Sequence, residues 1–407
     1  MSKFYWETKP LKELCSSIGD GIHATPIYVD KSEYFFINGN NLKDGFITIT
    51  ENTKQVSREE FKKYYVELDE STLLMSINGT LGSLALFRGE QVILGKSAAY
   101  INCKSIDRKF CYYYLQLDYV QKKMWNEATG STIKNLSLDS LKNLPIPIPK
   151  LETQQRIAAV LSALDTKIEL NNRINAELEA MAKTLYDYWF VQFDFPNEKS
   201  KPYKSSGGKM MWDSDLKRVI PEGWKAKPLK KMATIVMGQS PKSESYNQNN
   251  HGIPLINGAA DYVDGSLLAN TFTTSPTRLC KKDDLVFCIR ATIGNLTFAE
   301  DEFCLGRGVA AVRPNLDIYS ELVYYTLLNE IERFKKQASG SIIVGIKKED
   351  LTDSNIVEPS NEIVEKFHSI VSPIFKKQRL NKIENKNLSE LRDCLLPMLM
   401  NGQVKVK

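Results

Sequence analysis

The chain has 407 residues, 42% of them hydrophobic and 25% charged, with a formal net charge of +5. This ordinary globular balance favours two or three domains, and the mildly basic charge is compatible with a polyanionic partner without requiring one. No run of 18 apolar residues is present and Met1–Trp6 lacks the apolar core of a signal peptide, so no membrane span is expected. Seven cysteines without a Cys-x-x-Cys pair indicate free thiols in a reducing cytosol rather than a zinc site. We therefore expect a cytoplasmic protein.

Residues 1–148 are predicted to form a compact β-rich domain. Short apolar runs bounded by Gly, Asn and Asp are typical of strands, and they span Leu73–Ile77, Ser83–Phe87, Gln91–Leu94 and Tyr100–Cys103. Asp107 lies where the N-cap of a late helix is expected. The three prolines in Leu144–Pro149 disfavour helix, so this segment is predicted to be extended.

A long helix is predicted over residues 149–196. Its apolar residues recur at alternating spacings of four and three, which is a heptad seam and indicates packing on another helix. Two amides, Asn171 and Asn175, stand in the seam where leucine is expected. The predicted helix-pairing residues are Ile157, Leu161, Leu164, Ile168, Asn171, Asn175, Leu178 and Leu185.

The features of the first domain recur in the same order after residue 223. Residues 197–223 are polar and rich in lysine, serine and glycine, the composition of a linker. Beyond them, Leu74–Gly82 is matched by Val286–Gly294, which predicts a second β-rich domain over residues 224–358. Strands are expected at Leu285–Ile289 and Gly308–Val312, and an N-cap at Asp317.

A second long helix is predicted over residues 359–407, because Asn381 and Asn385 follow Asn171 and Asn175 at a constant interval of 210 residues. Its predicted helix-pairing residues are Phe367, Val371, Ile374, Asn381, Asn385, Leu388 and Leu395. We expect the two seams to pair as an antiparallel coiled coil whose amides fix the register. The alternative is that each helix lies on its own domain with its amides in water. Pro373 is expected to kink or break the second helix.

The resulting fold class is α+β, with two β-rich domains alternating with two long helices. No signature of catalysis accompanies it. The sequence has neither a Walker-type phosphate loop nor a Gly-x-Gly-x-x-Gly turn, no Gly-x-Ser-x-Gly elbow, and three histidines that form no His-Glu-x-x-His site. We therefore predict no catalytic residues and no metal site, which is typical of a recognition or scaffold protein.

Several short sequence segments, in this order along the chain, are similar to segments of one known family. They are Gln154–Ala158 after the proline-rich segment, Trp189–Phe190, Ile220–Trp224, and Leu395–Gly402. Together with the alternation of β-rich domains and long helices, they resemble the specificity subunit of type I restriction-modification systems over essentially the whole chain. The sequence departs from that pattern at its edges: no Pro-Glu-Gly precedes Trp6, and Pro359–Glu362 lacks the Gln-Gln pair that begins the first helix.

The resemblance implies that each β-rich domain is a target-recognition domain for one half of a bipartite, asymmetric site in double-stranded DNA. The paired helices would set the distance between the two target-recognition domains and would bind two methyltransferase subunits. These subunits would bind S-adenosylmethionine. Restriction/translocase subunits would use ATP and Mg²⁺, and this chain would carry no cofactor. The alternative in another class is a non-catalytic cytosolic scaffold that tethers two ligand- or peptide-binding modules through a coiled coil. A third possibility is a DNA-cleaving or DNA-methylating enzyme with cryptic motifs.

DNA contact requires Lys or Arg for phosphates, and amide or guanidinium groups that pair with base edges. In the first domain, the candidate residues lie in polar turns: Asn38, Asn40, Asn41, Lys43, Asn78, Thr80, Lys96 and Ser97. In the second domain, the candidates at matching places are Gln239, Ser240, Lys242, Asn257, Arg290, Thr292 and Arg307. Asn78 and Arg290 match in position but suit adenine and guanine respectively, so the two halves are expected to read different sequences. The alternative is ordinary turn chemistry, in which Asn and Gly permit positive φ.

Overall fold

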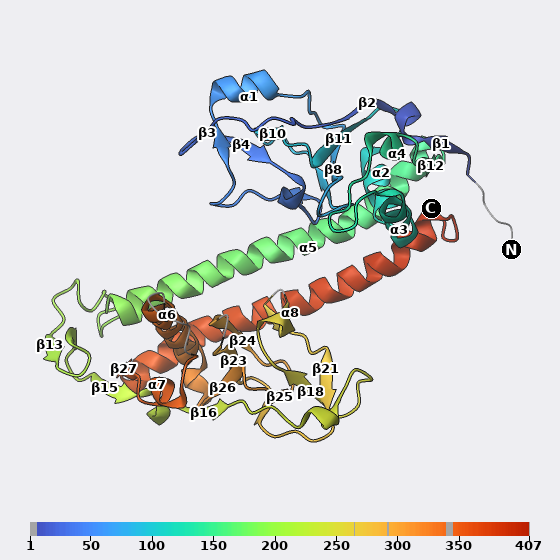
Figure 1. Ribbon diagram of the computed structural model, residues 1–407. Coiled ribbons are helices and arrows are strands. Elements are labelled where there is room, and N and C mark those ends of the chain that lie inside the picture. The colour runs from blue at the N-terminus through green and yellow to red at the C-terminus, as the bar shows by residue number, and fades with distance from the viewer. Residues whose placement is uncertain (1–5, 264, 291–292, 339–344, 407) are drawn as a thin grey trace. The chain divides into compact units, whose positions relative to one another are not determined.

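The computed structural model describes residues 6–263, 265–290, 293–338 and 345–406 (Figure 1). The chain divides into two compact units. The first unit contains residues 1–172 and 382–407, and the second contains residues 173–381. Each unit therefore holds one β-rich domain, named here the first β-domain (residues 6–148) and the second β-domain (residues 224–358), together with part of each of two long helices.

The first β-domain is built on two four-stranded sheets. One has the antiparallel order β2-β11-β8-β9, with bounds Cys15–Asp20, Ala98–Cys103, Thr72–Ser76 and Leu84–Leu86. The other has the order β10-β4-β7-β3, with bounds Val92–Leu94, Tyr34–Ile37, Gln55–Val56 and Tyr28–Val29. Two small two-stranded sheets complete the domain. In one, β1 (Thr8–Pro10) pairs with β12 (Pro145–Pro147), and in the other, β5 (Leu42–Lys43) pairs with β6 (Phe46–Ile47). The helices are α1 to α4, Arg58–Tyr64, Arg108–Leu115, Asp118–Glu127 and Leu138–Lys142.

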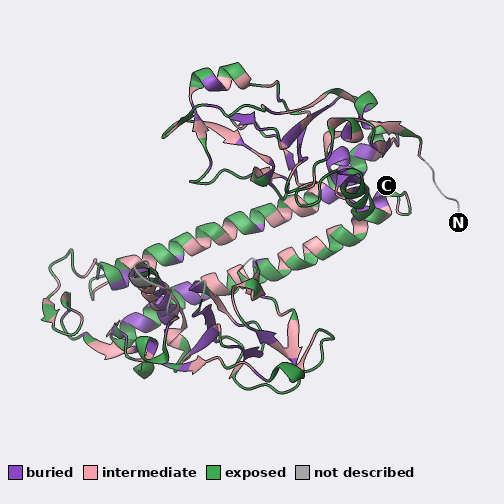
Figure 2. Ribbon diagram, in the orientation of Figure 1, coloured by how far each residue is buried: buried purple, intermediate pink, exposed green. Residues whose placement is uncertain are grey.

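The centre of this domain is strand β8, which is buried over its whole length (Figure 2). Its side chains alternate between two apolar clusters, because successive residues of a strand point to opposite faces. Leu73 and Met75 pack with Phe110 of α2, whereas Leu74 packs with Leu94 and the second sheet. The four predicted strands, the extended proline segment and the N-cap at Asp107 are confirmed, and the Phe110 N–H donates to Asp107 Oδ1 at 2.9 Å.

The second β-domain repeats this plan. Its antiparallel sheet has the order β16-β26-β23-β24, with bounds Ala233–Met237, Val309–Pro314, Leu285–Cys288 and Gly294–Phe298. Its five-stranded sheet has the order β17-β21-β18-β25-β22, with bounds Tyr246–Asn247, Thr271–Thr273, Ile253–Ile256, Phe303–Leu305 and Leu279–Cys280. The pairs are β15 with β27, Lys225–Pro228 and Asn355–Glu358, and β19 with β20, Tyr262–Val263 and Ser266–Leu267; the helices are α6, Ser320–Ala338, and α7, Lys348–Thr352. The equivalent sheet orders, and the parallel pairs β4 with β10 and β18 with β25, confirm the predicted internal repeat.

An ion pair between a buried carboxylate and a half-buried arginine fixes one end of the sheet β16-β26-β23-β24. Asp284, which precedes β23, is 2% exposed and accepts hydrogen bonds from Arg313 Nε at 2.7 Å and Arg313 Nη2 at 2.6 Å. Hydrogen bonding to Asp284, partly opposed by burial, raises the pKa of Arg313 above its ordinary value. The two-point geometry joins β26 to the turn before β23.

Two details differ from the sequence-based expectations. Residues 197–223 are not only a polar linker, because Met210–Asp213 (β13) and Arg218–Pro221 (β14) pair as an antiparallel hairpin. Asp317 is not the N-cap of an α-helix: it begins the 3-10 turn Asp317–Tyr319, and α6 starts at Ser320.

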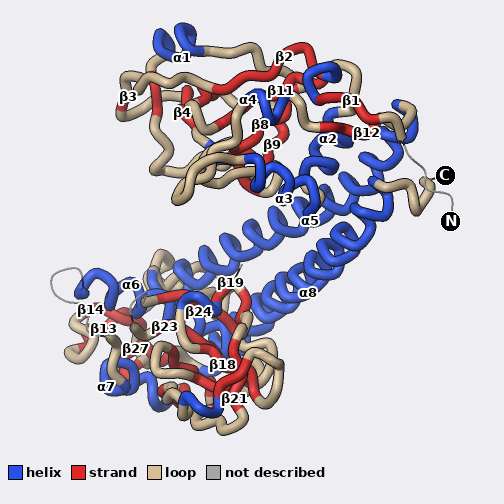
Figure 3. The backbone as a smooth tube through the Cα atoms, turned by 45° about the vertical axis from the view of Figure 1, so that its right-hand side comes forward, coloured by secondary structure: helices blue, strands red, loops and turns tan. Residues whose placement is uncertain are grey.

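The long helices are α5, Leu151–Tyr186, which ends in the π-helical turn Asp187–Val191, and α8, Asn361–Met400 (Figure 3). Helix α8 continues through Pro373, so the predicted break is wrong. Pro373 and Ser369 are both exposed, so water can hydrate the carbonyl that loses its partner. Within the described ranges, no helix is long and apolar enough to cross a membrane.

Candidate nucleic-acid interface

Two equivalent backbone hydrogen bonds in each β-domain establish which loop positions correspond between the domains. In the first, Ile77 N donates to Ser97 O and Leu136 N donates to Ile77 O, both at 2.9 Å. In the second, Ile289 N donates to Gly308 O and Ile346 N donates to Ile289 O, again both at 2.9 Å. Asn78 therefore corresponds to Arg290, Lys96 to Arg307, and Asn135 to Gly345. All six residues lie just beyond the ends of buried strands or beside the loops that meet there.

Some of the predicted DNA-binding residues of the first β-domain hold a turn together. Asn38 N donates to Asn41 Oδ1 at 2.9 Å, Ser97 Oγ donates to Asn38 Oδ1 at 3.1 Å, and Gly39 N donates to Ser97 Oγ at 2.9 Å. A Cβ at Gly95 would lie 2.2 Å from Asn38 Oδ1, so the loop before Lys96 has no room for a side chain there. For Asn38, Asn41 and Ser97, turn chemistry accounts for the amide and hydroxyl groups.

The remaining candidates of this domain are more accessible. Asn40, Lys43, Thr80 and Lys96 are exposed, and Thr80 Oγ1 lies 3.0 Å from Ser76 Oγ. Asn78 is half-buried and donates through Nδ2 to Asn135 Oδ1 at 3.2 Å. Asn135, which the sequence did not single out, thus fixes the orientation of the Asn78 amide.

The second β-domain carries a basic hollow of about 560 Å³ at the corresponding place. It brings together three predicted residues, Gln239, Arg290 and Arg307, with two that were not among the predicted residues, Arg278 and Lys347. Its other lining residues are Met237, Gly238, Ile289, Gly345 and Ile346. All four cationic side chains are exposed, and within the described part of the chain none of them is joined to a carboxylate by an ion pair. A concave surface with several unneutralised cations suits a polyanion.

The other predicted residues of the second β-domain lie around this hollow or away from it. Ser240 Oγ accepts from the backbone N–H and from Nε of Arg307, both at 3.4 Å. Asn257 N donates to Asp261 Oδ2 at 2.7 Å, and neither Asn257 nor the exposed Lys242 lines the hollow. Thr292 lies outside the described residues.

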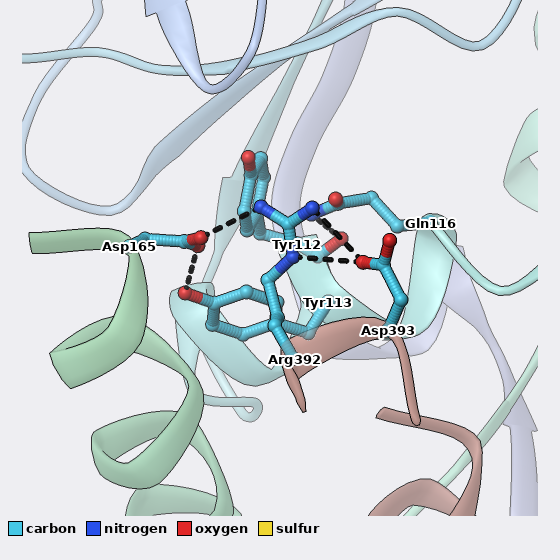
Figure 4. A network of polar contacts seen from close by, with 6 residues as sticks. All are labelled: Tyr112, Tyr113, Gln116, Asp165, Arg392 and Asp393. Carbon is cyan, nitrogen blue, oxygen red and sulfur yellow. Dashed lines mark hydrogen bonds and ion pairs between the residues drawn. The ribbon is translucent and has the colours of Figure 1, made fainter. Parts of the chain in front are cut away.

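A polar network attaches the first β-domain to both long helices within the first unit (Figure 4). Tyr113 of α2 donates through its hydroxyl to Asp165 Oδ2 of α5 at 2.5 Å, and Arg392 Nη1 of α8 donates to Asp165 Oδ1 at 2.8 Å. Arg392 also pairs with Asp393 at 2.9 Å. Burial, and then the hydrogen bond to Asp165, raise the pKa of Tyr113 well above its ordinary range, so this hydroxyl stays a donor.

The second unit uses the same device with different residues. Tyr325 of α6 donates through its hydroxyl to Glu179 Oε1 of α5 at 3.3 Å. Gln378 Nε2 of α8 donates to Glu179 Oε2 at 3.2 Å. In each unit, a carboxylate of α5 therefore receives one donor from the β-domain and one from α8.

The predicted seam amides meet partners inside each unit. In the first, Asn171 Nδ2 donates to Asn385 Oδ1 at 2.9 Å and to Glu384 Oε2 at 2.8 Å. In the second, Asn381 Nδ2 donates to Asn175 Oδ1 at 2.8 Å. Asn171 and Asn381 are each 1% exposed, so these two amides do not face water.

The other predicted helix-pairing residues differ in burial along the helices. Four are fully buried: Ile157, Leu161, Phe367 and Val371. The rest are half-buried: Leu164, Ile168, Asn175, Leu178, Leu185, Ile374, Asn385, Leu388 and Leu395. The fully buried ones lie where α5 and α8 pack on a β-domain of their own unit.

Comparison with known proteins identifies the family. The model of the type I restriction modification DNA specificity domain matches residues 5–180 and 221–389. The chain belongs to this family. A putative type I restriction enzyme specificity subunit, MjaX, from Methanocaldococcus jannaschii is 26% identical over 99% of this chain and 94% of its own length. The HindI specificity subunit from Haemophilus influenzae is 25% identical over 69% of this chain and 74% of its own.

The fold is also found among solved structures. The crystal structure of a type I restriction-modification system S subunit from M. genitalium has a TM-score of 0.63 and 19% identity, covering 98% of this chain and 97% of that one. The family predicted from the sequence is thus confirmed, and DNA specificity is supported over the tethering scaffold. No group of three or more His, Cys, Asp or Glu residues suited to a metal ion occurs among the described residues.

Proposed function

We propose that this chain is the DNA-reading subunit of a type I restriction-modification enzyme, and that each β-domain recognises one half of a bipartite, asymmetric DNA site. The observation that carries the proposal is the duplicated loop cluster with different chemistry in each copy. The first copy offers the Asn78 amide and Lys96, and the second offers a hollow with Arg290 and Arg307. Two such surfaces read two different sequences, because amide and guanidinium groups pair with different base edges.

In this proposal, α5 and α8 pair as an antiparallel coiled coil between the two recognition domains. The hydrogen bonds support it: Asp165 meets Arg392 and Asn171 meets Asn385 in the first unit, while Asn175 meets Asn381 in the second. Residue numbers rise on one helix as they fall on the other, as antiparallel pairing requires. Helix α5 has 36 residues, a length of about 54 Å at ~1.5 Å per residue, and this length sets the distance between the half-sites.

The partners follow from the family. Two methyltransferase subunits dock on the helices and supply S-adenosylmethionine, and restriction/translocase subunits supply ATP and Mg²⁺ chemistry. This chain contributes binding and positioning in the cytoplasm, with no catalysis. Its division is a first recognition domain at 1–148, a helix at 149–196, a connector at 197–223 that contains the β13–β14 hairpin, a second recognition domain at 224–358 and a second helix at 359–407.

The test is a domain exchange read by base-resolution mapping of DNA methylation. The second β-domain, residues 224–358, is replaced by that of a relative, and the chimera is expressed with the cognate methyltransferase subunit. We expect one half of the methylated motif to change while the other half and the spacer stay the same. The reciprocal exchange of residues 1–148 is the matched control and should change only the other half. A change of both halves in either chimera contradicts the assignment of one half-site to each domain.

A further inference from the structure

The corresponding loops of the two β-domains carry different residues at two positions. Within each domain, these two positions lie next to one another. In the first β-domain, the side chain at position 78 is an amide held by the amide at position 135, with Asn78 Nδ2 and Asn135 Oδ1 3.2 Å apart. In the second, position 290 is an arginine and position 345 is a glycine. A Cβ at Gly345 would lie 2.7 Å from Arg290 Cγ and 2.8 Å from Ile289 O. The residue at position 345 therefore determines whether the Arg290 side chain can adopt its observed conformation.

The first pair has the hydrogen-bonding pattern that adenine requires. Asn135 takes one Nδ2 hydrogen of Asn78, which fixes the amide plane and leaves Oδ1 and the second Nδ2 hydrogen of Asn78 available. An acceptor and a donor side by side match the N6 amino group and N7 of adenine in the major groove. The backbone N–H and C=O of Asn135 are both bonded to Thr129, so its side chain is the part that varies without loss of the loop.

The second pair suits guanine. Arg290 is exposed and lines the basic hollow, and its guanidinium has no hydrogen bond to another described residue. A planar guanidinium group in this state can donate two parallel hydrogen bonds, one to O6 and one to N7 of guanine. The surrounding Arg278, Arg307 and Lys347 supply positive charge for phosphates, which adds affinity that does not depend on sequence.

We propose that each recognition domain has one pair of specificity-determining residues, and this inference rests on the proposed function. The pair is Asn78 with Asn135 in the first domain and Arg290 with Gly345 in the second. Asn78, oriented by Asn135, selects an adenine in the first half-site. Arg290, in the space left by Gly345, selects a guanine in the second. Gly345 is a positioning residue, since it acts only through Arg290.

The experiment maps methylation at base resolution in cells that express each variant with its methyltransferase partner. The wild-type half-site assigned to the second domain by the exchange above should contain a G·C pair. Arg290→Ala removes the guanidinium group, so methylation should spread to other bases at one position of that half-site. A bidentate pair discriminates by about 5- to 150-fold, and that preference should be lost. Gly345→Ala should relax the same position, because the added methyl displaces Arg290.

Transfer of the pair to the first domain tests the inference in the opposite sense. Asn78→Arg combined with Asn135→Gly should change one adenine of the first half-site to guanine, with the second half-site unchanged. Asn78→Arg alone should fail to make that change, since Asn135 still occupies the space. Lys282→Ala, at an exposed residue outside the hollow, is the matched control and should leave the motif unaltered.

The outcomes separate this inference from the proposed function. If the wild-type chain directs methylation of no bipartite motif, the proposed function fails. If a bipartite motif is present but Arg290→Ala leaves every base preference in place, Arg290 is not the reader, and a change caused by Arg307→Ala would assign that role to Arg307. Thermal unfolding of the purified variants shows that each has kept its fold. A variant that unfolds early is replaced by Arg290→Gln at the same position, which must relax the same base.

Discussion

Replacing Asn171 and Asn385 together by leucine should raise the free energy of unfolding of the first unit. Asn171 is 1% exposed, and its Oδ1 has no hydrogen-bond partner in the described part of the chain. Its two Nδ2 bonds go to Glu384 and Asn385, and Asn385 in turn donates to the exposed Asn172 at 2.7 Å. Leucine has the same number of side-chain heavy atoms as asparagine and the same branching at Cγ, but its methyl groups are bulkier, so the seam should accept it with local repacking.

The expected gain is a small difference between opposing contributions. Removing a buried acceptor that lacks a partner recovers about 1–3 kcal/mol. Burying one leucine fully and a second in part adds about 2–4 kcal/mol. The two lost hydrogen bonds of Asn171 subtract about 1–3 kcal/mol together, and Glu384 and Asn172 become hydrated. At their middle values these contributions leave a net stabilisation of about 3 kcal/mol, and each kcal/mol raises the melting temperature by about 2–4 °C.

The assay is a double-mutant cycle followed by calorimetry of the full chain. Asn171→Leu alone leaves Asn385 without its donor, so it should gain less than the double variant. Asn387→Leu, at an exposed position of the same helix, is the matched control and should change stability by less than about 0.5 kcal/mol. A double variant less stable than the wild type would show that the amides hold the helices together more strongly than apolar packing does. The apolar seam should also tolerate slipped registers that the amides exclude.

Three further predictions concern other parts of the chain. Asp284→Asn should destabilise the second unit by about 1–3 kcal/mol in chemical denaturation, because the buried side chain keeps only one acceptor oxygen and its amide nitrogen faces donors; Asp283→Asn, at an exposed surface pair, should cost less than about 1 kcal/mol. Burial raises the pKa of Tyr112 to about 12, so the unfolded chain, whose tyrosines ionise near ~10, binds fewer protons between those values. Stability should therefore fall as pH rises from about 10 to 12, with no such loss below about 10, which tyrosinate absorbance and unfolding curves would show together. Four residues inserted near Glu177 and four near Asn387 lengthen each helix by about 6 Å, so the unread spacer should grow by roughly one to two base pairs in methylation maps; an active variant with the original spacer would mean that the helices do not set it.

The features that could be predicted from the sequence are those that burial dictates locally. Strand β8 was predicted because five consecutive buried residues require an apolar run, and Leu73–Ile77 has one. The long helices were predictable because a heptad repeat continues for many turns and is interrupted by asparagine at the same two places in both copies. The apolar run and each heptad repeat are carried by residues that are close together in the chain, and the second copy of the repeat supports the first.

The features that were missed depend on which loops meet in space. Arg278 lies just before β22, a strand with no counterpart in the first β-domain, and nothing in the sequence separates Lys347 from the other lysines, yet the fold brings both to the hollow that holds Arg290. Asn135 could not be singled out, because its role depends on an isolated bridge to Asn78, 57 residues earlier. The β13–β14 hairpin has strands of only four residues inside a polar segment, too short for a periodic signal.

Comparison of the two copies distinguishes the residues that stabilise each β-domain from the residues that each β-domain exposes for recognition. The backbone bonds that place Asn78 and Arg290 have the same pattern and the same 2.9 Å length in both copies. The strands behind them are buried, so a substitution there disturbs packing and stability. The side chain of Arg290 is exposed and is bonded to no other described residue, so a change there should alter stability by less than about 0.5 kcal/mol. A recognition surface built in this way can change the base it reads while the strands and helices that position it stay the same.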